Sequence, residues 1–281
     1  MEFRSILVHL DGGSHAAARI AYAGALALQF DAQLQGLAPT GWAVIPPDGI
    51  SIAGLEAYQQ SAMRTLMDQA ESCVTRFKEQ TAAMGVGKVC AKVEVGYDGE
   101  AMTAAARYCD VTVVTRIDAH PQKPPQSPHM PEDVLMGSGR PVLVLPCLGS
   151  HAPPPPSRVL LAWNGSREAA RAAHDALPLL RKAGRVDVVT FSASEEGHRQ
   201  PTGPANADVG IWLAEHGVHA EVTRVPTRLN AGEAILESAG VMRADLIVAG
   251  GYGHSRLGEA VFGGATRVLM RSSPVPVLLS H

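Results

Sequence analysis

The chain has 281 residues, which is enough for two domains of ordinary size, each with its own hydrophobic core. Hydrophobic residues make up 46% of the chain and charged residues 18%, proportions typical of a globular protein. The formal net charge is −3, aromatic residues make up only 5%, and no basic run is present, so the composition argues against a nucleic-acid partner.

The cysteines and the apolar runs indicate the compartment. No CxxC spacing is present, which favours thiols in a reducing compartment over disulfides or zinc ligands. The apolar run 6–8 follows Met1 too closely to leave room for a signal peptide. No apolar stretch approaches the roughly 18 residues that a membrane-spanning helix needs. We therefore expect a cytoplasmic protein with no membrane partner. The cysteines are Cys73, Cys90, Cys109 and Cys147.

In the first half of the chain, short β-branched and leucine runs alternate with helical patterns. The alanine-rich segment 16–27 follows the first apolar run, and the patterns also predict an extra loop at 39–54 and a long helix at 55–84. The predicted strands are 4–10, 33–38, 89–95, 110–115 and 141–145.

The second half follows the same order of elements. Continuous apolar strands such as 246–249 indicate burial on both faces, which requires a parallel sheet with helices on either side. Gly184 and Gly217 stand where helix C-caps belong. The predicted strands are 158–163, 186–192, 219–225, 245–249 and 275–279, and the predicted helices are 166–182, 204–216, 231–242 and 264–272. The predicted fold class is therefore α/β, with two Rossmann-like, doubly wound domains of five parallel strands each.

Five sequence matches in the same order show that the chain repeats itself. A proline-rich linker at 149–156 separates the two copies. We predict one domain at 1–148 and a second at 157–281. The matched pairs are Asp11-Gly12 with Asn164-Gly165, Gly99-Glu100-Ala101 with Gly232-Glu233-Ala234, Asp110 with Asp245, Val134-Leu135-Met136 with Val268-Leu269-Met270, and Pro141-Val142-Leu143 with Pro276-Val277-Leu278.

A glycine-rich segment from Gly250 to Thr266 follows the fourth predicted strand of the second half and leads directly into a helix. In an open parallel sheet, ligands bind beyond the carboxyl ends of the strands. Small residues let backbone amides approach a phosphate, and a helix N-terminus adds unsatisfied amides. A plain glycine-rich turn is the alternative, but the position between a strand and a helix favours anion binding. The polar side chains available to an anion are Ser255, Thr266, His254, Arg256 and Arg267.

The spacing of the glycines is that of the nucleotide loop of the universal stress protein family: glycine, two residues, glycine, nine residues, glycine. Gly250, Gly253 and Gly263 match this pattern. Supporting marks are a first strand that ends in Asp11 or Asn164, the Gly-Glu-Ala helix start and the final Pro-Val-Leu strand. Both halves carry these marks, so the chain resembles a tandem universal stress protein of the adenine nucleotide alpha-hydrolase-like superfamily. The resemblance implies that the chain binds ATP, ADP or AMP, with or without Mg²⁺.

The resemblance also implies which residues bind the nucleotide. Asn164 stands where nucleotide-binding members have an aspartate that contacts the adenosine moiety, and an amide can both donate and accept. Gly264 stands where the family usually has serine or threonine, so one hydroxyl is lost, while Thr266 matches a further phosphate contact. The implied nucleotide-binding residues are Ala162, Asn164, Phe191, Ser192, Ala249, Gly250, Gly253, Gly263, Gly264, Ala265 and Thr266.

The first half lacks this loop. Several prolines follow its fourth predicted strand, and the first glycine after Asp110 is Gly137. Because proline supplies no amide donor, we infer that this half has lost the nucleotide site. It is predicted to be structural, or to bind another ligand in a pocket bounded by 39–54 and 116–131. Asp11 has no partner acid or base identifiable in the sequence, which favours a capping or loop role.

Two classes of function remain open. The leading one is a stress-response or signalling protein that binds an adenine nucleotide in its second half and thereby alters a surface for a protein partner. Hydrolysis is expected to be slow at most, because the sequence offers no dedicated base, Walker lysine or magnesium carboxylate set, and no catalytic residue or metal site is assigned. The alternative is a nucleotide-independent small-ligand binding or scaffold protein with a vestigial loop. A third hypothesis is an enzyme that uses His254 to handle phosphate.

The resemblance also implies how the two halves of the chain assemble. In this family the last strands of two domains pair across a pseudo-twofold axis, so the resemblance implies pairing of 142–145 with 275–279 within one chain. Such pairing covers strand edges that would otherwise be exposed, and makes the tandem chain an intramolecular pseudo-dimer. The sequence leaves open whether two chains form a homodimer and which protein partner they bind.

Overall fold

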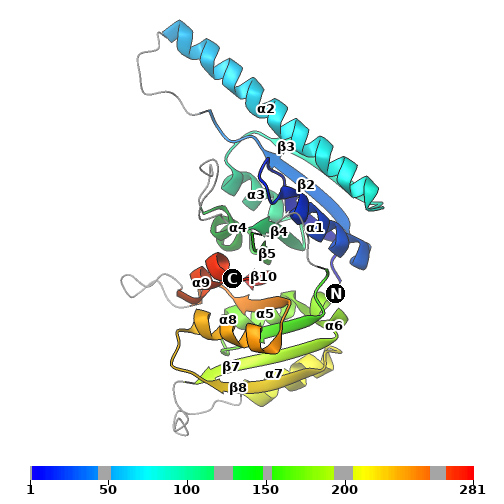
Figure 1. The fold of residues 1–281 in the computed structure, drawn as a ribbon, viewed down its shortest axis with the longest axis vertical. Helices are drawn as coiled ribbons and strands as arrows, with labels where there is room; N and C mark the ends of the chain where they lie inside the picture. The colour runs from blue at the N-terminus through cyan, green and yellow to red at the C-terminus, as the bar shows by residue number, and fades with distance from the viewer. Residues whose placement is uncertain (1, 44–51, 117–128, 148–153, 193–204, 254–263) are drawn as a thin grey trace. The chain divides into compact units, whose positions relative to one another are not determined.

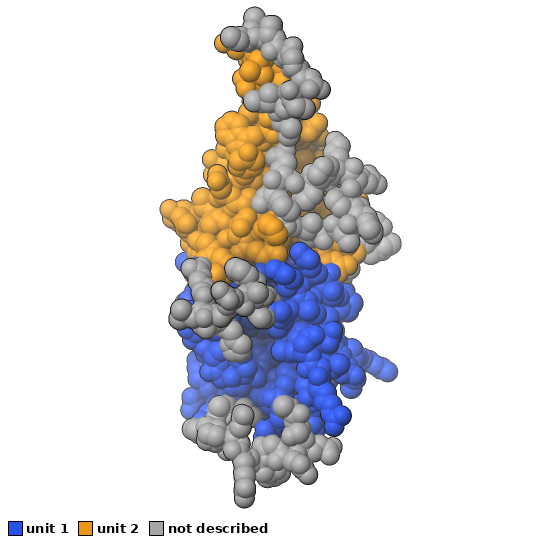
Figure 2. Space-filling model, turned by 90° about the vertical axis from the view of Figure 1, so that its left-hand side faces the viewer, with its two compact units in different colours: residues 1–3, 139–146, 155–281 blue, residues 4–138, 147–154 orange. Residues whose placement is uncertain are grey.

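The structure is a computed structural model that describes residues 2–43, 52–116, 129–147, 154–192, 205–253 and 264–281. The chain divides into two compact units, which Figure 2 colours separately. The division follows the sequence repeat except at the last strand of the first copy, which lies in unit 1. Unit 1 comprises Met1–Phe3, Gly139–Pro146 and Pro155–His281, and unit 2 comprises Arg4–Ser138 and Cys147–Pro154.

Unit 2 contains a parallel sheet with the strand order β3-β2-β1-β4. Helices α1 and α2 contact each other along one face of this sheet, and α3 and α4 contact each other along the other face (Figure 1). The central strands are apolar and buried, as two covered faces require. The strands are β1 (Ser5–His9), β2 (Gln33–Pro39), β3 (Val89–Glu94) and β4 (Val111–Thr115), and the helices are α1 (Ala16–Phe30), α2 (Ile52–Ala83), α3 (Asp98–Ala106) and α4 (Met130–Ser138).

Unit 1 contains a sheet with the strand order β5-β10-β9-β6-β7-β8. Helix α5 packs on β9 and β10, whereas α8 packs on α9, β6 and β7. The strands are β5 (Val142–Leu145), β6 (Arg158–Ala162), β7 (Arg185–Ser192), β8 (Ala220–Pro226), β9 (Leu246–Gly250) and β10 (Val277–Ser280). The helices are α5 (Arg167–Asp175), α6 (Leu177–Lys182), α7 (Ala205–Glu215), α8 (Ala231–Met242) and α9 (Gly264–Ser272).

The last strands of the two copies pair with each other inside unit 1. Strand β5 is antiparallel to β10, with Leu278 opposite Leu143, while the other neighbours in this sheet are parallel. Every residue of β5 and β10 is buried. The pairing expected between 142–145 and 275–279 is therefore confirmed.

The predicted order of strands and helices is confirmed in both copies, and the predicted helix 166–182 is the one that differs. It is divided at Ala176 into α5 and α6. Pro178 lies in the first turn of α6, where its missing N–H costs no hydrogen bond. A single helix through this point would need that N–H, so the division follows from the proline.

The two copies share local hydrogen bonds as well as sequence. The carboxylate of Asp110 accepts the N–H of Ser5 at 2.9 Å, and the carboxylate of Asp245 accepts the N–H of Arg158 at 2.8 Å. Each aspartate precedes the fourth strand of its copy and fixes the start of the first strand. The aspartates matched by sequence therefore have the same structural role.

Two predicted helix ends differ in geometry. Gly217 follows α7 with a φ of +76°, the left-handed conformation that a C-terminal glycine allows. Gly184 follows α6 and donates its N–H to the carbonyl oxygen of Ser157 at 2.8 Å, beside the start of β6. The first glycine ends a helix, and the second joins a helix to the sheet.

Two further features are the state of the cysteines and the hydropathy of the helices. The four cysteines are free thiols in the structure, with Cys73 and Cys109 buried and Cys90 exposed. Among the helices that the structure describes, none combines the length and the hydropathy needed to cross a membrane.

Candidate functional site

The glycine-rich segment begins where β9 reaches the carboxyl edge of the sheet of unit 1. Gly251 donates its N–H to the carbonyl oxygen of Ser280 at 2.8 Å, which extends the pairing with β10 by one residue. Tyr252 then turns the chain with a φ of +53°. It donates its N–H to Oγ1 of Thr266 at 3.0 Å. This hydrogen bond joins the start of the loop to the first turn of α9.

Gly250 lies against the first turn of α5. A Cβ at this position would come within 2.6 Å of both the amide nitrogen of Ala169 and the carbonyl carbon of Glu168. Both contacts are with backbone, which cannot give way without moving the helix. Only glycine therefore fits here, and the first predicted loop glycine is required by packing against α5.

Gly253 borders a buried carboxylate that the sequence analysis did not identify. A Cβ at Gly253 would come within 2.7 Å of Oε2 of Glu168, whose side chain is only 3% exposed. Burial acts to raise the pKa of Glu168, but the hydrogen bond from the exposed guanidinium of Arg167 outweighs it and holds the pKa below its usual value. The ionised carboxylate of Glu168 on α5 therefore lies beside the start of the loop, paired with Arg167.

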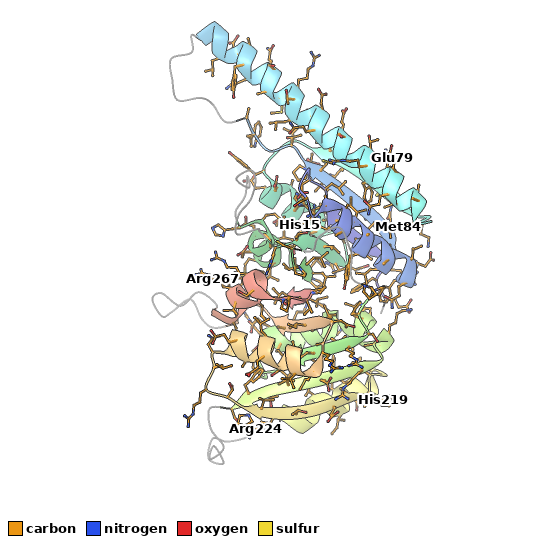
Figure 3. All side chains as sticks on the ribbon, in the orientation of Figure 1. His15, Glu79, Met84, His219, Arg224 and Arg267 are labelled. Atoms are coloured by element: carbon orange, nitrogen blue, oxygen red, sulfur yellow. The ribbon has the colours of Figure 1, made fainter. Side chains whose placement is uncertain are left out.

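The first turn of α9 is open at its start. Gly264 is exposed, and a Cβ there would meet no atom of the described residues within 4 Å. Thr266 is buried, whereas Arg267 is exposed and extends from α9 (Figure 3). Gly263 and the side chains of His254, Ser255 and Arg256, which the sequence analysis also considered, lie outside the described residues.

The residues expected to surround adenine lie at the ends of three neighbouring strands. Ala162 ends β6, Phe191 and Ser192 end β7, and Ala249 lies near the end of β9. Since β6 is paired with both β7 and β9, these positions share one edge of the sheet. Ala162 and Ala249 are buried, and the two β7 residues are half-buried.

Asn164 follows β6 and is exposed. Its Oδ1 accepts the N–H of Ser166 at 3.0 Å, while the hydroxyl of Ser166 caps α5 by accepting the N–H of Ala169. One side of the Asn164 amide therefore shapes the turn before α5, and the two N–H donors of the amide remain.

The matching edge of unit 2 has a different chemistry. Oδ1 of Asp11 accepts the N–H of Gly13 at 2.9 Å, the same turn that Asn164 makes in unit 1. The loop role expected for Asp11 is thus confirmed, but its carboxylate also lies close to a guanidinium and an imidazole. Nη2 of Arg19 lies 2.9 Å from Oδ1 of Asp11, and Nδ1 of His9 lies 3.5 Å from Oδ2 of Asp11. His9 and Arg19 are both buried.

Asp98 completes this group from the first turn of α3. Its Oδ2 lies 4.0 Å from Nε2 of His9. Burial and the nearby carboxylate of Asp11 raise the pKa of Asp98 to about 6. Burial lowers the pKa of His9 to about 4, so its imidazole is neutral near pH 7. Burial of Asp11 acts to raise its pKa, but the Arg19 guanidinium prevails and holds the pKa below its usual value.

His9, Arg19 and Asp98 were not among the site residues expected from the sequence. A histidine in an otherwise apolar strand and an arginine within an alanine-rich helix were the available signals, because buried polar side chains need partners. No group of three or more His, Cys, Asp or Glu side chains among the described residues is placed to hold a metal ion.

Comparison with known proteins gives a family match for the second half of the chain. The family model described as "Universal stress protein family" matches residues 156–281. A universal stress protein from Archaeoglobus fulgidus DSM 4304 is 19% identical, with a TM-score of 0.72 over 98% of this chain and 95% of its own. A protein of unknown function from Pseudomonas aeruginosa PAO1 is 15% identical, with a TM-score of 0.62 over 99% of this chain and 92% of its own. No protein with a curated function matches the sequence.

The family match and the structural matches cover different parts of the chain and support different conclusions. The family match covers the half of the chain that carries Gly250 and Gly253, whereas the whole-chain matches are below 25% identity and establish the fold. Residues 156–281 therefore belong to the universal stress protein family, and the chain as a whole has the fold of a tandem-domain universal stress protein.

Proposed function

We propose that unit 1 binds an adenine nucleotide, either ATP, ADP or AMP, at the carboxyl edge of β6, β7 and β9, and that the protein acts in signalling or stress response. The observation that carries this proposal is the 3.0 Å hydrogen bond from the N–H of Tyr252 to Oγ1 of Thr266. This hydrogen bond holds the start of the loop beside the first turn of α9. Backbone N–H groups of the loop and of the helix N-terminus therefore lie close together. Small residues and a helix N-terminus together favour phosphate.

The phosphates would contact mainly the backbone of α9. The N–H groups of Gly264 and Ala265 are among the first of the helix, which have no acceptor within it. A Cβ on Gly264 would contact none of the described residues. Thr266 accepts from Tyr252 and keeps its own O–H to donate. Arg267 adds an exposed positive charge on the same turn.

The adenosine moiety would lie over the ends of β6 and β7. The Nδ2 hydrogens of Asn164 can donate to a ring nitrogen or a ribose hydroxyl, because its Oδ1 is already bonded to Ser166. The short side chain of Ala162 and the half-buried ring of Phe191 would flank the base. Asn164 would therefore bind the adenosine moiety without the negative charge that an aspartate would bring.

Hydrolysis is proposed to be slow at most. Rapid phosphoryl transfer depends on charged groups and metal ions placed around the phosphate. The described start of the loop, Gly250–Gly253, carries no charged side chain, and its charged neighbour Glu168 is ionised and bonded to Arg167. We therefore propose that the protein binds the nucleotide and hydrolyses it slowly at most.

The test compares two substitutions at the first residue of α9. Gly264→Pro removes the N–H at a position where a helix tolerates proline, while Gly264→Ala keeps the N–H and places its methyl group in open space. Calorimetric titration with ATP, ADP and AMP should show wild-type affinity for Gly264→Ala. Gly264→Pro should bind about tenfold more weakly, the usual effect of losing one hydrogen bond to a charged group.

Equal affinities for the proline and alanine variants would contradict the assigned phosphate contact. A wild-type chain whose thermal midpoint does not move on addition of ATP and Mg²⁺ would contradict nucleotide binding altogether and favour a nucleotide-independent scaffold. Circular dichroism of both variants should match the wild type, because neither substitution fills occupied space.

A further inference from the structure

The carboxyl edge of the sheet of unit 2 carries a group of side chains that the proposed nucleotide site does not use. His9 and Asp11 come from the end of β1, Asp98 begins α3, and Trp42 and Tyr97 lie just beyond β2 and β3. In open α/β sheets this edge is where ligands bind. The negative charges here disfavour a phosphate, so a different ligand chemistry is indicated.

The charges at this edge do not balance. Arg19 lies against Asp11, with 2.9 Å between Nη2 and Oδ1, and both are ionised at neutral pH. The ion-pair partner that the described residues give Asp98 is His9, at 4.0 Å, and this imidazole is neutral near pH 7. The Asp98 side chain is 21% exposed, so one carboxylate faces the edge without a cation of its own.

The Nδ1 atom of His9 is buried and makes no hydrogen bond within the described residues. The side chain of His9 is 6% exposed. The imidazole lies between the two carboxylates, with Nδ1 3.5 Å from Asp11 and Nε2 4.0 Å from Asp98. A buried polar atom without a partner is uncommon in folded proteins, which points to a ligand or water that completes the group.

Two exposed aromatic rings stand beside the carboxylates. Trp42 is 46% exposed and Tyr97 is 47% exposed, and their rings meet edge to face with 6.4 Å between centroids. A backbone bridge between Gly41 and Gly96 holds the two segments together. Tyr97 directly precedes Asp98, so aromatic surface and negative charge occupy the same corner of the sheet. Aromatic faces and a carboxylate together bind organic cations.

We propose that unit 2 binds a small organic cation, an amine protonated at neutral pH, at the edge formed by His9, Asp98 and the Trp42–Tyr97 pair. The ammonium group would donate hydrogen bonds to the carboxylate of Asp98. The apolar body of the amine would pack on the two aromatic rings. This site is separate from the nucleotide site proposed for unit 1 and does not depend on it.

The affinity should depend on pH through Asp98. Among the described residues, the charged and titratable groups that face it are His9 from β1, Asp11 just after β1 and Arg19 from α1. Burial, with the charge of Asp11, raises the pKa of Asp98 to about 6, so the carboxylate is mostly ionised at pH 7 and mostly protonated at pH 5. The amine needs the ionised form, and its affinity should fall about tenfold between pH 7 and pH 5.

The experiment is calorimetric titration of the full chain with phenethylamine as the probe and phenethyl alcohol as its uncharged counterpart. Asp98→Asn is compared with Glu100→Gln, which removes one exposed charge from the same first turn of α3. Trp42→Ala is compared with Tyr108→Ala, which removes an 84% exposed ring elsewhere in unit 2.

We expect the wild type to bind the amine and to bind the alcohol about tenfold more weakly or not at all. Asp98→Asn and Trp42→Ala should each reduce the affinity for the amine about tenfold, while the two control variants bind like the wild type. The proposal is overturned if the wild type does not bind the amine, if it binds both probes equally, or if Glu100→Gln weakens binding as much as Asp98→Asn. Gly264→Pro should leave amine binding unchanged. A failure of the nucleotide proposal can therefore be distinguished from a failure of the amine proposal.

Discussion

Glu168 is the residue that most affects how unit 1 would accept a phosphate. Its ionised carboxylate borders Gly253 and is paired with Arg167 on one side only, so it would repel the phosphates of a nucleotide bound at the loop unless a cation lay between them. Mg²⁺ commonly binds through nucleotide phosphates and one or two carboxylates, which fits a single glutamate at this position. Glu168 places a negative charge beside the loop, and the glycine spacing of the loop does not indicate this charge.

Removing that charge should change the metal dependence of nucleotide binding. We expect wild-type affinity for ATP to be about three- to tenfold higher in Mg²⁺ than in EDTA, and Glu168→Gln to narrow this difference by raising the affinity in EDTA. The control is Glu237→Gln on the exposed surface of α8. Calorimetry in both buffers measures the effect, and an unchanged ratio in Glu168→Gln would show that the carboxylate does not face the phosphates.

Asp98 should lower the stability of unit 2 at neutral pH. Its folded-state pKa is raised, mainly by burial, from 3.8 to about 6, so ionising it costs more in the folded chain than in the unfolded chain. Stability is therefore lost as pH rises from about 4 to about 6, the window set by these two values.

The variant Asp98→Asn should consequently be more stable than the wild type at pH 7, by about 1–3 kcal/mol, with no advantage below about pH 4. Urea unfolding at several pH values measures this difference. Loss of stability at pH 7 on substitution would mean that the carboxylate supports the fold, for example as a favourable charge at the start of α3.

Among the helices, α8 and α9 are held close by one glycine. A Cβ on Gly232 would come within 3.0 Å of Cα of Ala265 in the first turn of α9 and within 2.7 Å of Cβ of Val268 in the middle of that helix. Gly232 begins the Gly-Glu-Ala motif, so this part of the repeat positions the helix proposed to hold phosphate. The sequence indicated a helix start at this motif, and the structure adds the reason for the glycine.

A matched pair of substitutions on α8 tests this packing. Gly232→Ala must push α9 away and should lower the free energy of unfolding by about 1–3 kcal/mol. Gly240→Ala lies on the same helix with nothing within 4 Å of its added methyl group. It should raise stability by about 0.5–1 kcal/mol, through helix propensity alone. Chemical denaturation measures both changes. A stabilised Gly232→Ala would contradict the close contact.

At the scale of the whole molecule, the two sequence copies and the two compact units do not coincide. Strand β5 belongs to the first copy by sequence, yet it lies in unit 1 and pairs with β10. Without β5, the buried strand β10 becomes the edge of its sheet and presents an apolar, unpaired row of backbone groups.

A fragment of residues 157–281 should therefore associate with itself, because a second β10 can replace β5 in antiparallel pairing. The full chain is the control. Size-exclusion chromatography with light scattering should give a higher mass than one fragment, or aggregation. A stable, monodisperse monomer would show that β10 does not need a partner strand.

Most of the fold was accessible from the sequence because its signals are local. The helices 231–242 and 264–272 were predicted with the bounds of α8 and α9, since each has clear capping or glycine signals. The division of 166–182 at Ala176 was missed because the effect of Pro178 depends on where the helix begins. In unit 1 the structure brings Ala162, Asn164 and Gly250 to one sheet edge, as predicted, and their contact with a nucleotide stays a prediction.

The sequence by itself determined the two copies, their order of strands and helices, and the glycine spacing of the loop, because all of these are patterns along the chain. Only the tertiary structure decided that Glu168 borders Gly253, and that His9, Arg19 and Asp98 meet Asp11. The physical reason is that charge, burial and strand pairing act between segments far apart in sequence. Their free energies depend on distances that no local pattern records.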